Sequence, residues 1–413
     1  MKRNIYIINE EGVAAMYGIG TFIENLRRCF DDSAYNIIVI NLNSRIDEVS
    51  LYFNEIISTI DIPSTKYSSQ KEKSIYYEKI IFLLRHLIPH YDRENVFFFN
   101  YQCNGSMIPL LKKYYRNSQM IFIIHYLNWT LEIQGNTSFF KSIINQEEDN
   151  LKTERERKIY RQFQENLIVF NQADKIICLS KYTRQLLLDQ YSILNEKVCL
   201  IYNGLQDNPI SLNAEEKINL RKSLYFTEDE KIILYVGRLD KYKGGIELIE
   251  AFRTLLNDNI NCRLIIVGSG DDSVYFQQTE NIWSKVIFTG RIEKDLVCKF
   301  YQIADVGVLP SFSEQCSYVA IEMMMHRVPI VGTDSTGLSE MILDGINGYK
   351  VQLRENKDSV LLCSSELSGS IKKVINDSKH QKELSRGARN QYLSNYTIDL
   401  MKKQYNLLCE YQY

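Results

Sequence analysis

The sequence of 413 residues predicts an α/β protein with two domains, each built on a doubly wound parallel sheet. Three observations predict this fold class. Short apolar runs rich in β-branched residues alternate with helical patterns along most of the chain. The runs are apolar on both faces, as strands covered by helices on each side must be. They also fall into two series, separated by a stretch rich in Gly, Asn, Asp and Pro at 200–217.

The expected strands follow one another in the same pattern in both halves of the chain. The first series comprises residues 4–9, 35–42, 95–100, 120–125 and 175–180. The second series comprises residues 231–237, 262–268, 286–290, 306–310 and 328–333. Two series of buried strands imply two sheets.

The predicted domains are Rossmann-like units at 1–205 and 206–394. The tail at 395–413 has an amphipathic pattern, and we expect a helix that crosses back to pack on the first domain. Residues 139–166 are polar and charge-rich, which favours a solvated helix.

Composition excludes several classes of protein. The chain has 49 basic and 51 acidic residues, which argues against a nucleic-acid binder held by a broad positive field. Its nine cysteines form no C-x-x-C pair, so neither a disulfide framework nor a zinc site is expected. The first apolar stretch ends at Asn9, too short for a signal peptide, and no apolar run approaches the roughly 20 residues that span a bilayer. A soluble, cytoplasmic protein is therefore expected.

One segment leaves two interpretations open. Residues 76–93, "YYEKIIFLLRHLIPHYDR", are amphipathic. Packing against the first sheet is the favoured use, and peripheral contact with the inner face of a membrane is the alternative.

Ligands of open parallel sheets bind where the carboxyl ends of strands lead into helices. After the first strand, Gly18 and Gly20 lie in "YGIGTF", where the backbone can approach a ligand and helix-start amides favour anions. The third glycine of a dinucleotide fingerprint is missing, which disfavours an NAD oxidoreductase. A turn without a ligand stays open for this loop.

The stretch "VGRLDKYKGG" at 236–245 is more informative. Gly237 and Arg238 follow a buried strand, and Lys243 precedes a helix that starts near Gly245. Both cations can hold phosphate oxygens, and arginine can do so with two parallel hydrogen bonds. Gly268, in "VGSGDD", marks a further turn at a strand end.

The stretch "SEQCSYVAIEMM" at 313–324 carries two carboxylates eight positions apart. Glu314 lies on a loop, and Glu322 lies in a helix that starts near Ser317. The first amides of that helix, at Ser317, Tyr318 and Val319, form an expected anion site. Both carboxylates can then reach one ligand from different sides.

These blocks, in this order, resemble the retaining GT-B glycosyltransferases of family 4, the group 1 glycosyltransferases. The resemblance is dense from about 198 to 351 and thinner over the N-terminal half. Glu314 and Glu322 match the E-x7-E motif of the family. The other matching blocks are "VCLIYNGL", "ILYVGRLDKYKG", "LIIVGSGDD", "VIFTGRI", "ADVGVLPSFSE", "VPIVGTDSTGLSEMILDGINGYKV" and "ARNQYLSNYT".

The resemblance implies a GT-B fold with two domains facing a cleft. It also implies that the N-terminal domain, 1–205, binds the acceptor and that the C-terminal domain, 206–394, binds most of a nucleotide-diphosphate sugar, the donor. Arg238 and Lys243 match the cations that hold the diphosphate. Glu314 matches the acid at the donor-sugar hydroxyls, and Glu322 matches the acid that binds the ribose.

The remaining matches are less specific. His125, at the end of the strand 120–125, matches the N-domain histidine at the donor sugar. Gly18 and Gly20 match the loop near the diphosphate and the acceptor. The backbone that reads the base corresponds to Val286, Ile287 and Phe288.

The chain also departs from the family. Gln315, Cys316 and Ser317 stand where a glycine-rich stretch is usual, which predicts a narrowed donor pocket or a different sugar. Cys316 as a nucleophile is disfavoured, because no partner base is evident nearby.

The expected function is retaining transfer of a sugar from a UDP- or GDP-sugar to an acceptor hydroxyl, in bacterial glycan or glycoconjugate synthesis. No D-x-D triplet occurs, so we expect no metal and no other cofactor, with Arg238, Lys243 and helix-start amides supplying the positive charge. The acceptor is a glycan, a glycolipid, a small molecule or a polypeptide. The alternatives are a catalytically silent binding or chaperone subunit and a nucleotide-sugar epimerase.

Overall fold

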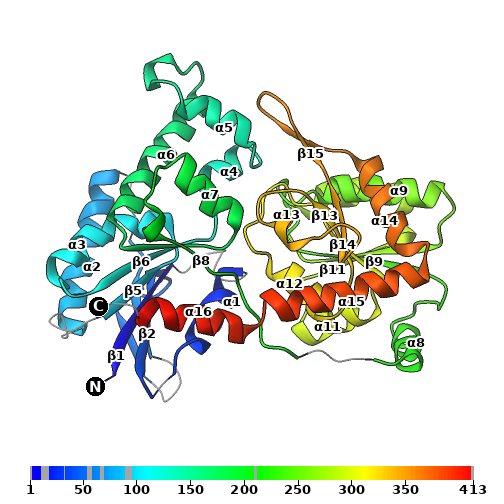
Figure 1. Cartoon of the computed structure of the whole chain (residues 1–413), viewed down its shortest axis with the longest axis horizontal. Helices are drawn as coiled ribbons and strands as arrows, with labels where there is room; N and C mark the ends of the chain where they lie inside the picture. The colour runs from blue at the N-terminus through cyan, green and yellow to red at the C-terminus, as the bar shows by residue number, and fades with distance from the viewer. Residues whose placement is uncertain are drawn as a thin grey trace. The chain divides into compact units, whose positions relative to one another are not determined.

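The computed structural model describes residues 2–10, 18–31, 33–53, 58–65, 69–88, 95–208 and 212–410. The chain divides into two compact units, each with its own parallel sheet (Figure 1). Unit 1 comprises Met1–Leu127, Gln146–Tyr202 and Ile398–Tyr413, and unit 2 comprises Asn128–Asn145 and Asn203–Thr397. The predicted fold class, two doubly wound parallel sheets, is confirmed.

Unit 1 has an eight-stranded sheet of order β3-β4-β2-β1-β5-β6-β7-β8. All neighbours pair in parallel except β3 with β4. The chain adds strands on one side of β1 and then on the other, so the β1–β5 pair is the topological switch point of this sheet. The strands are β1 (Arg3–Glu10), β2 (Tyr35–Ser44), β3 (Ser50–Phe53), β4 (Ser58–Pro63), β5 (Asn95–Phe99), β6 (Gln119–Ile124), β7 (Lys175–Cys178) and β8 (Val198–Leu200).

The C-terminal helix α16 (Ile398–Glu410) belongs to unit 1, as predicted. It packs beside α1 (Gly18–Arg28), because the Tyr405 ring meets Phe22 edge-on with 6.5 Å between ring centroids. Arg3 also donates a hydrogen bond to the carbonyl oxygen of Cys409. The other helices of unit 1 are α2 (Gln70–Leu87), α3 (Ile108–Tyr114), α6 (Glu154–Gln172) and α7 (Lys181–Asp189).

The amphipathic segment 76–93 falls largely on α2, and residues 89–94 lie outside the described residues. The buried side of the helix packs inside unit 1, with Tyr77 and Leu84 almost fully buried. Tyr115, which follows α3, donates its hydroxyl to the carbonyl oxygen of Leu84 at 3.2 Å. The described part of this segment therefore packs inside unit 1, against α3 and the residue that follows it.

The expectation of one solvated helix over 139–166 is wrong. The chain forms α5 (Thr137–Ile144), a short turn, and then α6, and both helices bury apolar side chains. Ile159 and Phe163, four residues apart on α6, are buried because they share one helix face. The charged residues of the segment occupy the other face and hide this pattern in the overall composition.

Unit 2 has a six-stranded parallel sheet of order β11-β10-β9-β12-β13-β14. Its switch point lies between β9 and β12, which pair directly. The strands are β9 (Lys231–Val236), β10 (Cys262–Val267), β11 (Val286–Gly290), β12 (Val306–Leu309), β13 (Ile330–Thr333) and β14 (Gly348–Val351), with a separate antiparallel hairpin of β15 (Leu353–Glu355) and β16 (Val360–Leu362).

Helices connect these strands and cover the sheet of unit 2 (Figure 1). Unit 2 also contains α4 (Asn128–Glu132) and α5, which lie between β6 and β7 in the chain and whose residues the sequence grouped with the N-terminal domain. The helices that follow are α8 (Ala214–Ser223), α9 (Gly245–Asn257), α10 (Asp272–Thr279), α11 (Lys294–Ile303), α12 (Tyr318–Met325), α13 (Leu338–Met341), α14 (Ser364–Ile375) and α15 (Ser378–Asn395).

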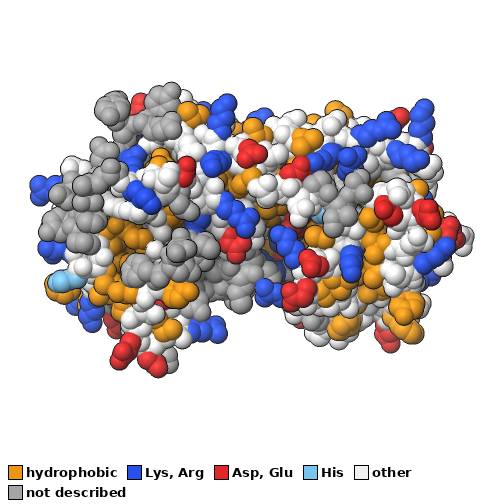
Figure 2. Space-filling view, turned by 90° about the horizontal axis from the view of Figure 1, so that it is seen from below, with side chains coloured by type: hydrophobic (Ala, Val, Ile, Leu, Met, Phe, Trp, Pro, Cys, Tyr) orange, Lys and Arg blue, Asp and Glu red, His pale blue; other side chains and the backbone are white. Residues whose placement is uncertain are grey.

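Charged side chains of both signs are interspersed on the face drawn in Figure 2, in keeping with the near-zero net charge. Within the described ranges, no helix is both long enough and apolar enough to pass through a lipid bilayer.

Candidate functional site

The loops at the carboxyl ends of β9 and β12 are joined at the switch point of unit 2. Gly244 adopts a left-handed φ of 66°, and a Cβ there would lie 2.1 Å from the carbonyl oxygen of Pro310. Only glycine fits such an approach. The amide of Phe312 also donates to the carbonyl oxygen of Tyr242 at 3.0 Å. The loop that ends at the start of α9 therefore lies directly against the loop that carries Glu314.

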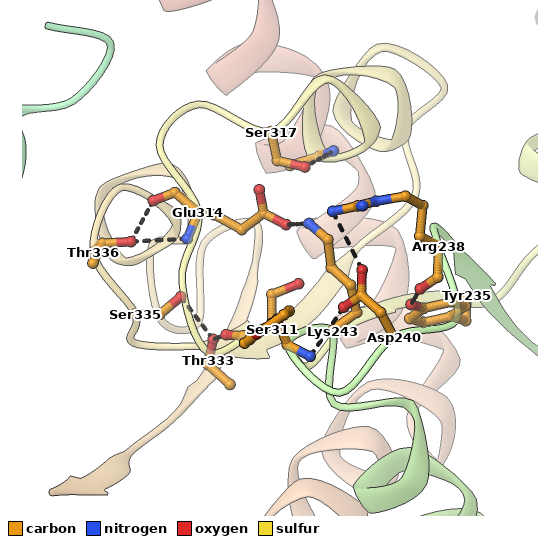
Figure 3. Close-up of polar contacts among 12 residues, drawn as sticks. Tyr235, Arg238, Asp240, Lys243, Ser311, Glu314, Ser317, Thr333, Ser335 and Thr336 are labelled. Carbon is orange, nitrogen blue, oxygen red and sulfur yellow. Dashed lines mark hydrogen bonds and ion pairs between the residues drawn. The ribbon is translucent and has the colours of Figure 1, made fainter. Parts of the chain in front are cut away.

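Lys243 and Glu314 form an ion pair across these two loops (Figure 3). Their side chains are 22% and 17% exposed, so the pair is largely shielded but still open to a ligand. Thr336 fixes the backbone of Glu314: its Oγ1 accepts from the Glu314 amide at 2.9 Å and donates to the Glu314 carbonyl oxygen. Two residues predicted from separate motifs thus meet in one place.

Arg238 lies beside this pair, and its charged end is turned toward the same point in Figure 3. Its Nη2 is 3.2 Å from Oδ2 of Asp240. The other oxygen of Asp240 accepts from the Tyr242 amide at 2.9 Å, and Tyr235 donates its hydroxyl to the carbonyl oxygen of Arg238 at 2.7 Å. These hydrogen bonds fix the backbone of the loop that follows β9, while the guanidinium of Arg238 stays half-exposed.

The helix start predicted near Ser317 is confirmed. Ser317 is the N-cap of α12, and its hydroxyl accepts from the Ala320 amide at 3.3 Å. The backbone amides of Tyr318 and Val319 form the first turn, where the helix dipole favours an anion. This helix start follows the loop of Glu314 directly.

Gln315 and Cys316 stand where the family usually has a glycine-rich stretch, and both side chains are buried. Gln315 is 7% exposed and Cys316 is 6% exposed. Burial raises the pKa of the Cys316 thiol to about 12, so this thiol is protonated at neutral pH. A nucleophilic role for Cys316 therefore has no support in the structure.

Glu322 lies on the second turn of α12, and its partner differs from that of Glu314. The hydroxyl of Tyr301, on α11, donates to Oε2 of Glu322 at 2.8 Å. Burial raises the pKa of the Glu322 carboxyl, while this hydrogen bond and the charge of Lys294 act in the opposite direction. The two acids of the E-x7-E pattern thus have different surroundings, one paired with a cation and one with a hydroxyl.

Glycines bring the next strand end close to the β9 loop. Gly268 has a φ of 139°, and a Cβ there would lie 1.8 Å from the carbonyl oxygen of Gly237. Beyond it, Val286 is buried, while Ile287 and Phe288 are half-buried on β11. The carboxyl ends of β9, β10 and β11 therefore form one continuous edge.

His125 follows β6 in unit 1, near the switch point of that sheet. The amide nitrogen of Asn100 donates to the carbonyl oxygen of Ile8 at 3.2 Å, which turns its Oδ1 toward Nε2 of His125 at 2.9 Å. The hydrogen of a neutral ring is then on Nε2, and Nδ1 is an acceptor. The predicted glycines of α1 differ from each other, since Gly18 is exposed and Gly20 is half-buried.

Burial lowers the pKa of His125 to about 3, below the ordinary 6.5. Between these values the unfolded chain binds one more proton than the folded protein, so stability falls as pH falls through this window. In His125→Gln we expect the slope of unfolding free energy against pH to shrink by about one proton, ~1.4 kcal/mol per pH unit, between pH 4 and 6. Urea unfolding at several pH values measures this, and an unchanged slope would contradict the burial of a neutral ring.

Several residues of the site escaped the sequence reasoning. Asp240 lies within the predicted block "GRLDKYKG" and could have been found as the carboxylate nearest to Arg238. Tyr301 and Thr336 lie 21 and 22 positions from the acids that they contact, and nothing in the sequence links them. Among the side chains that the structure describes, no group of three or more His, Cys, Asp or Glu could hold a metal ion.

Two family models match the chain, and together they cover most of its length. "Glycosyltransferase Family 4" matches residues 16–208, and "Glycosyl transferases group 1" matches residues 216–391. An uncharacterized glycosyltransferase of Methanocaldococcus jannaschii is 33% identical over 237 residues, 56% of this chain and 58% of that protein. A lipopolysaccharide 1,2-N-acetylglucosaminetransferase of Salmonella typhimurium is 27% identical over 219 residues, 50% of this chain and 55% of that protein. The chain thus matches little more than half the length of these relatives.

Solved structures match over nearly the whole chain. Sucrose-phosphate synthase from Thermosynechococcus elongatus aligns over 99% of this chain and 98% of its own, with a TM-score of 0.74 and 18% identity. HepE from Anabaena, in complex with UDP and glucose, aligns over 99% of this chain and 100% of its own, with a TM-score of 0.73 and 15% identity. At these identities the similarity concerns the fold.

Proposed function

Because the chain belongs to the group 1, family 4 glycosyltransferases and has the GT-B fold, we propose that it transfers a sugar from a nucleotide-diphosphate sugar to an acceptor hydroxyl. The observation that carries the proposal is the meeting of Arg238, Lys243 and Glu314 at the β9–β12 switch point of unit 2. That is where an open parallel sheet binds a ligand.

The charges of this site suit a diphosphate. Arg238 and Lys243 supply two cations, and the start of α12 supplies backbone amides directed at the same ligand. As the bond between the sugar and the diphosphate breaks, negative charge grows on the leaving phosphate. Fixed positive groups that are already in place stabilise that charge without reorganising.

In this proposal Glu314 and Glu322 bind different parts of the donor. Glu314 accepts hydrogen bonds from sugar hydroxyls, and its ion pair with Lys243 holds it beside the diphosphate site. Glu322 accepts from the ribose hydroxyls through the oxygen that Tyr301 does not use. His125, with Nδ1 as an acceptor, contacts the donor sugar, a role taken from the family resemblance.

A uridine nucleotide is the first donor candidate. The HepE structures of the same fold were solved in complex with UDP, with UDP and glucose, and with UDP-glucose. The acceptor is proposed to be a glycan or glycoconjugate hydroxyl, and the name of the Salmonella relative supports this class. Retention of the anomeric configuration is proposed from the family resemblance.

Metal independence is a separate proposal. The chain lacks a D-x-D triplet, and the cations of the β9 loop can neutralise the leaving group. We expect transfer to proceed at an unchanged rate in 5 mM EDTA (about a thousandfold excess over enzyme) and to gain nothing from added Mg²⁺ or Mn²⁺. Loss of transfer in EDTA, restored by one of these ions, would reject metal independence while leaving the donor site unaffected.

Binding tests the proposed donor site without knowledge of the acceptor. Thermal unfolding is followed with UDP-, GDP- and ADP-sugars and with the matching nucleoside diphosphates. A ligand at 100 times its Kd adds about 2.7 kcal/mol to stability, so one nucleotide series is expected to raise Tm by several degrees. If no nucleotide raises the Tm of the unsubstituted protein, the proposed function fails.

A further inference from the structure

The segment 128–145, which contains α4 and α5, belongs to unit 2 although the residues before and after it belong to unit 1. The chain leaves unit 1 after Leu127, two residues beyond His125, and returns to unit 1 at Gln146. Between these points it packs on unit 2. The Trp129 and Phe140 rings stack within the segment with 3.9 Å between centroids, and both are fully buried. The segment 128–145 is therefore a structural element with its own buried aromatic contact.

Asn136 fastens this segment to the β15–β16 hairpin. It is fully buried, and its Nδ2 donates to the carbonyl oxygens of Asn356 at 2.8 Å and Ser359 at 3.1 Å. Its Oδ1 caps α5 by accepting from the Phe139 amide at 2.8 Å. Both N–H groups of this side chain and one lone pair of its carbonyl oxygen are used, so the attachment depends on an amide at this position.

Glu355 adds a second attachment from the same hairpin. Its two carboxylate oxygens accept from the backbone amides of Thr137 at 2.8 Å and Ser138 at 3.1 Å, at the start of α5. A carboxylate at this end of a helix is favoured by the exposed amides and by the helix dipole. The hairpin turn and the start of α5 therefore hold each other from both sides.

On its other side the segment reaches the loop of Glu314. Gly135 is buried with a left-handed φ of 75°, and a Cβ there would lie 3.1 Å from the carbonyl oxygen of Phe312 and 3.4 Å from Cβ of Ser313. The amide of Phe312 is meanwhile bound to Tyr242, next to Lys243. The peptide just before Glu314 is thus confined between the β9 loop and the segment 128–145.

We propose that the segment 128–145, fastened by Asn136, is a positioning element that sets the place of Glu314 in the donor site. It acts through Gly135 on residues 312–313 and touches no part of the donor itself. The proposal rests on the proposed function in one respect: the ligand that Glu314 meets is the sugar of a nucleotide-sugar.

The variant Asn136→Asp isolates the attachment. Aspartate keeps the cap of α5 but replaces the donor with an acceptor that faces two carbonyl oxygens, which is strongly unfavourable in a buried place. The matched control is Asn213→Asp. Asn213 also caps a helix of unit 2 through Oδ1, and its amide nitrogen donates to no described residue.

Hydrogen exchange of the ligand-free protein measures how firmly the loop 311–316 is held, and this measurement does not depend on the proposed function. We expect amides 311–316 to exchange at least tenfold faster in Asn136→Asp than in the unsubstituted protein, and at the unsubstituted rate in Asn213→Asp. Unchanged exchange at 311–316 in Asn136→Asp overturns the proposal. This result is separate from any failure of nucleotide binding, which would reject the proposed function alone.

Calorimetric titration then distinguishes a positioning role from general damage, with UDP-glucose and UDP as probes. We expect Asn136→Asp to weaken UDP-glucose binding about tenfold and UDP binding less than twofold, because only the sugar meets Glu314. Equal weakening of both ligands indicates loss of the whole donor site and overturns the positioning role.

A milder variant guards against a failure of Asn136→Asp to fold. Gly135→Ala pushes a methyl group toward Phe312, and Gly345→Ala is its control, with a similar φ of 71° and no neighbour within 4 Å. Both carry the same backbone strain, so a loss of UDP-glucose preference in Gly135→Ala alone supports the proposal. Equal behaviour of the two variants overturns it.

Discussion

Replacing Glu314 by Gln is expected to lower kcat by about 10²–10³-fold while leaving the fold intact, which is the usual cost of removing one preorganised polar group from an active site. The amide keeps the shape of the side chain but loses the charge that pairs with Lys243. It also presents an N–H group where, in the proposed function, a carboxylate oxygen accepts from the donor sugar. Steady-state transfer or hydrolysis of the nucleotide-sugar measures the change.

Two comparisons keep this result specific to the site. UDP affinity is expected to change little in Glu314→Gln, because the nucleotide is proposed to be held by other residues. Glu366→Gln, which removes an exposed surface carboxylate paired with Arg354, is expected to retain kcat within about twofold, as surface pairs contribute little. A kcat for Glu314→Gln above one tenth of the unsubstituted value would remove Glu314 from the reaction.

Replacing Lys243 by Met is expected to lower kcat/KM by about 10- to 100-fold. A hydrogen bond to a charged group is worth about 1.5–3 kcal/mol, and each 1.4 kcal/mol is a factor of ten. The substitution removes a cation from the proposed diphosphate site and leaves Glu314, which is 17% exposed, without its ion-pair partner. We therefore expect weaker binding of UDP as well as of the nucleotide-sugar.

The same loop offers a closely matched control for this variant. Lys241 lies two positions earlier, and its Nζ is 5.1 Å from the Tyr242 ring centroid, outside the ion pair with Glu314. Lys241→Met removes the same charge from the same loop and is expected to change kcat/KM less than threefold at physiological salt. Lys243→Arg, which keeps the charge, should restore part of the loss. Equal losses in Lys241→Met and Lys243→Met would reduce the role of Lys243 to general electrostatics.

The sequence predicted the parallel sheets well because their strands are apolar on both faces. Residues 4–9 and 231–237 can be identified as buried strands without knowledge of any contact. The edge strand β3 and its neighbour β4 escaped prediction, since "SLYF" and "STIDIP" are short and the consecutive residues Ser50, Leu51 and Tyr52 of β3 are all exposed. Such strands are defined by their pairing, which the sequence does not record.

The site likewise contains residues that the sequence predicts and contacts that it does not. Arg238 and Lys243 could be found because a strand end, a glycine turn and a helix start lie within ten residues of one another. The meeting of Lys243 with Glu314 depends on β9 and β12 being neighbours, which only the sheet order shows. The segment 128–145 could not be assigned to unit 2 from its own residues, because Asn136 is attached more than 200 positions away.

Release of nucleoside diphosphate from a panel of UDP-, GDP- and ADP-sugars, followed with the unsubstituted protein and Glu314→Gln side by side, is the decisive measurement. Water can replace the unknown acceptor in a slow turnover, so the test needs no acceptor. We expect the unsubstituted protein to release nucleoside diphosphate from one nucleotide series, and Glu314→Gln to bind that nucleotide while releasing it at least a hundredfold more slowly. Two results would contradict sugar transfer at this site. In one, the unsubstituted protein binds the nucleotide-sugar but releases no nucleoside diphosphate; in the other, both proteins release it at the same rate.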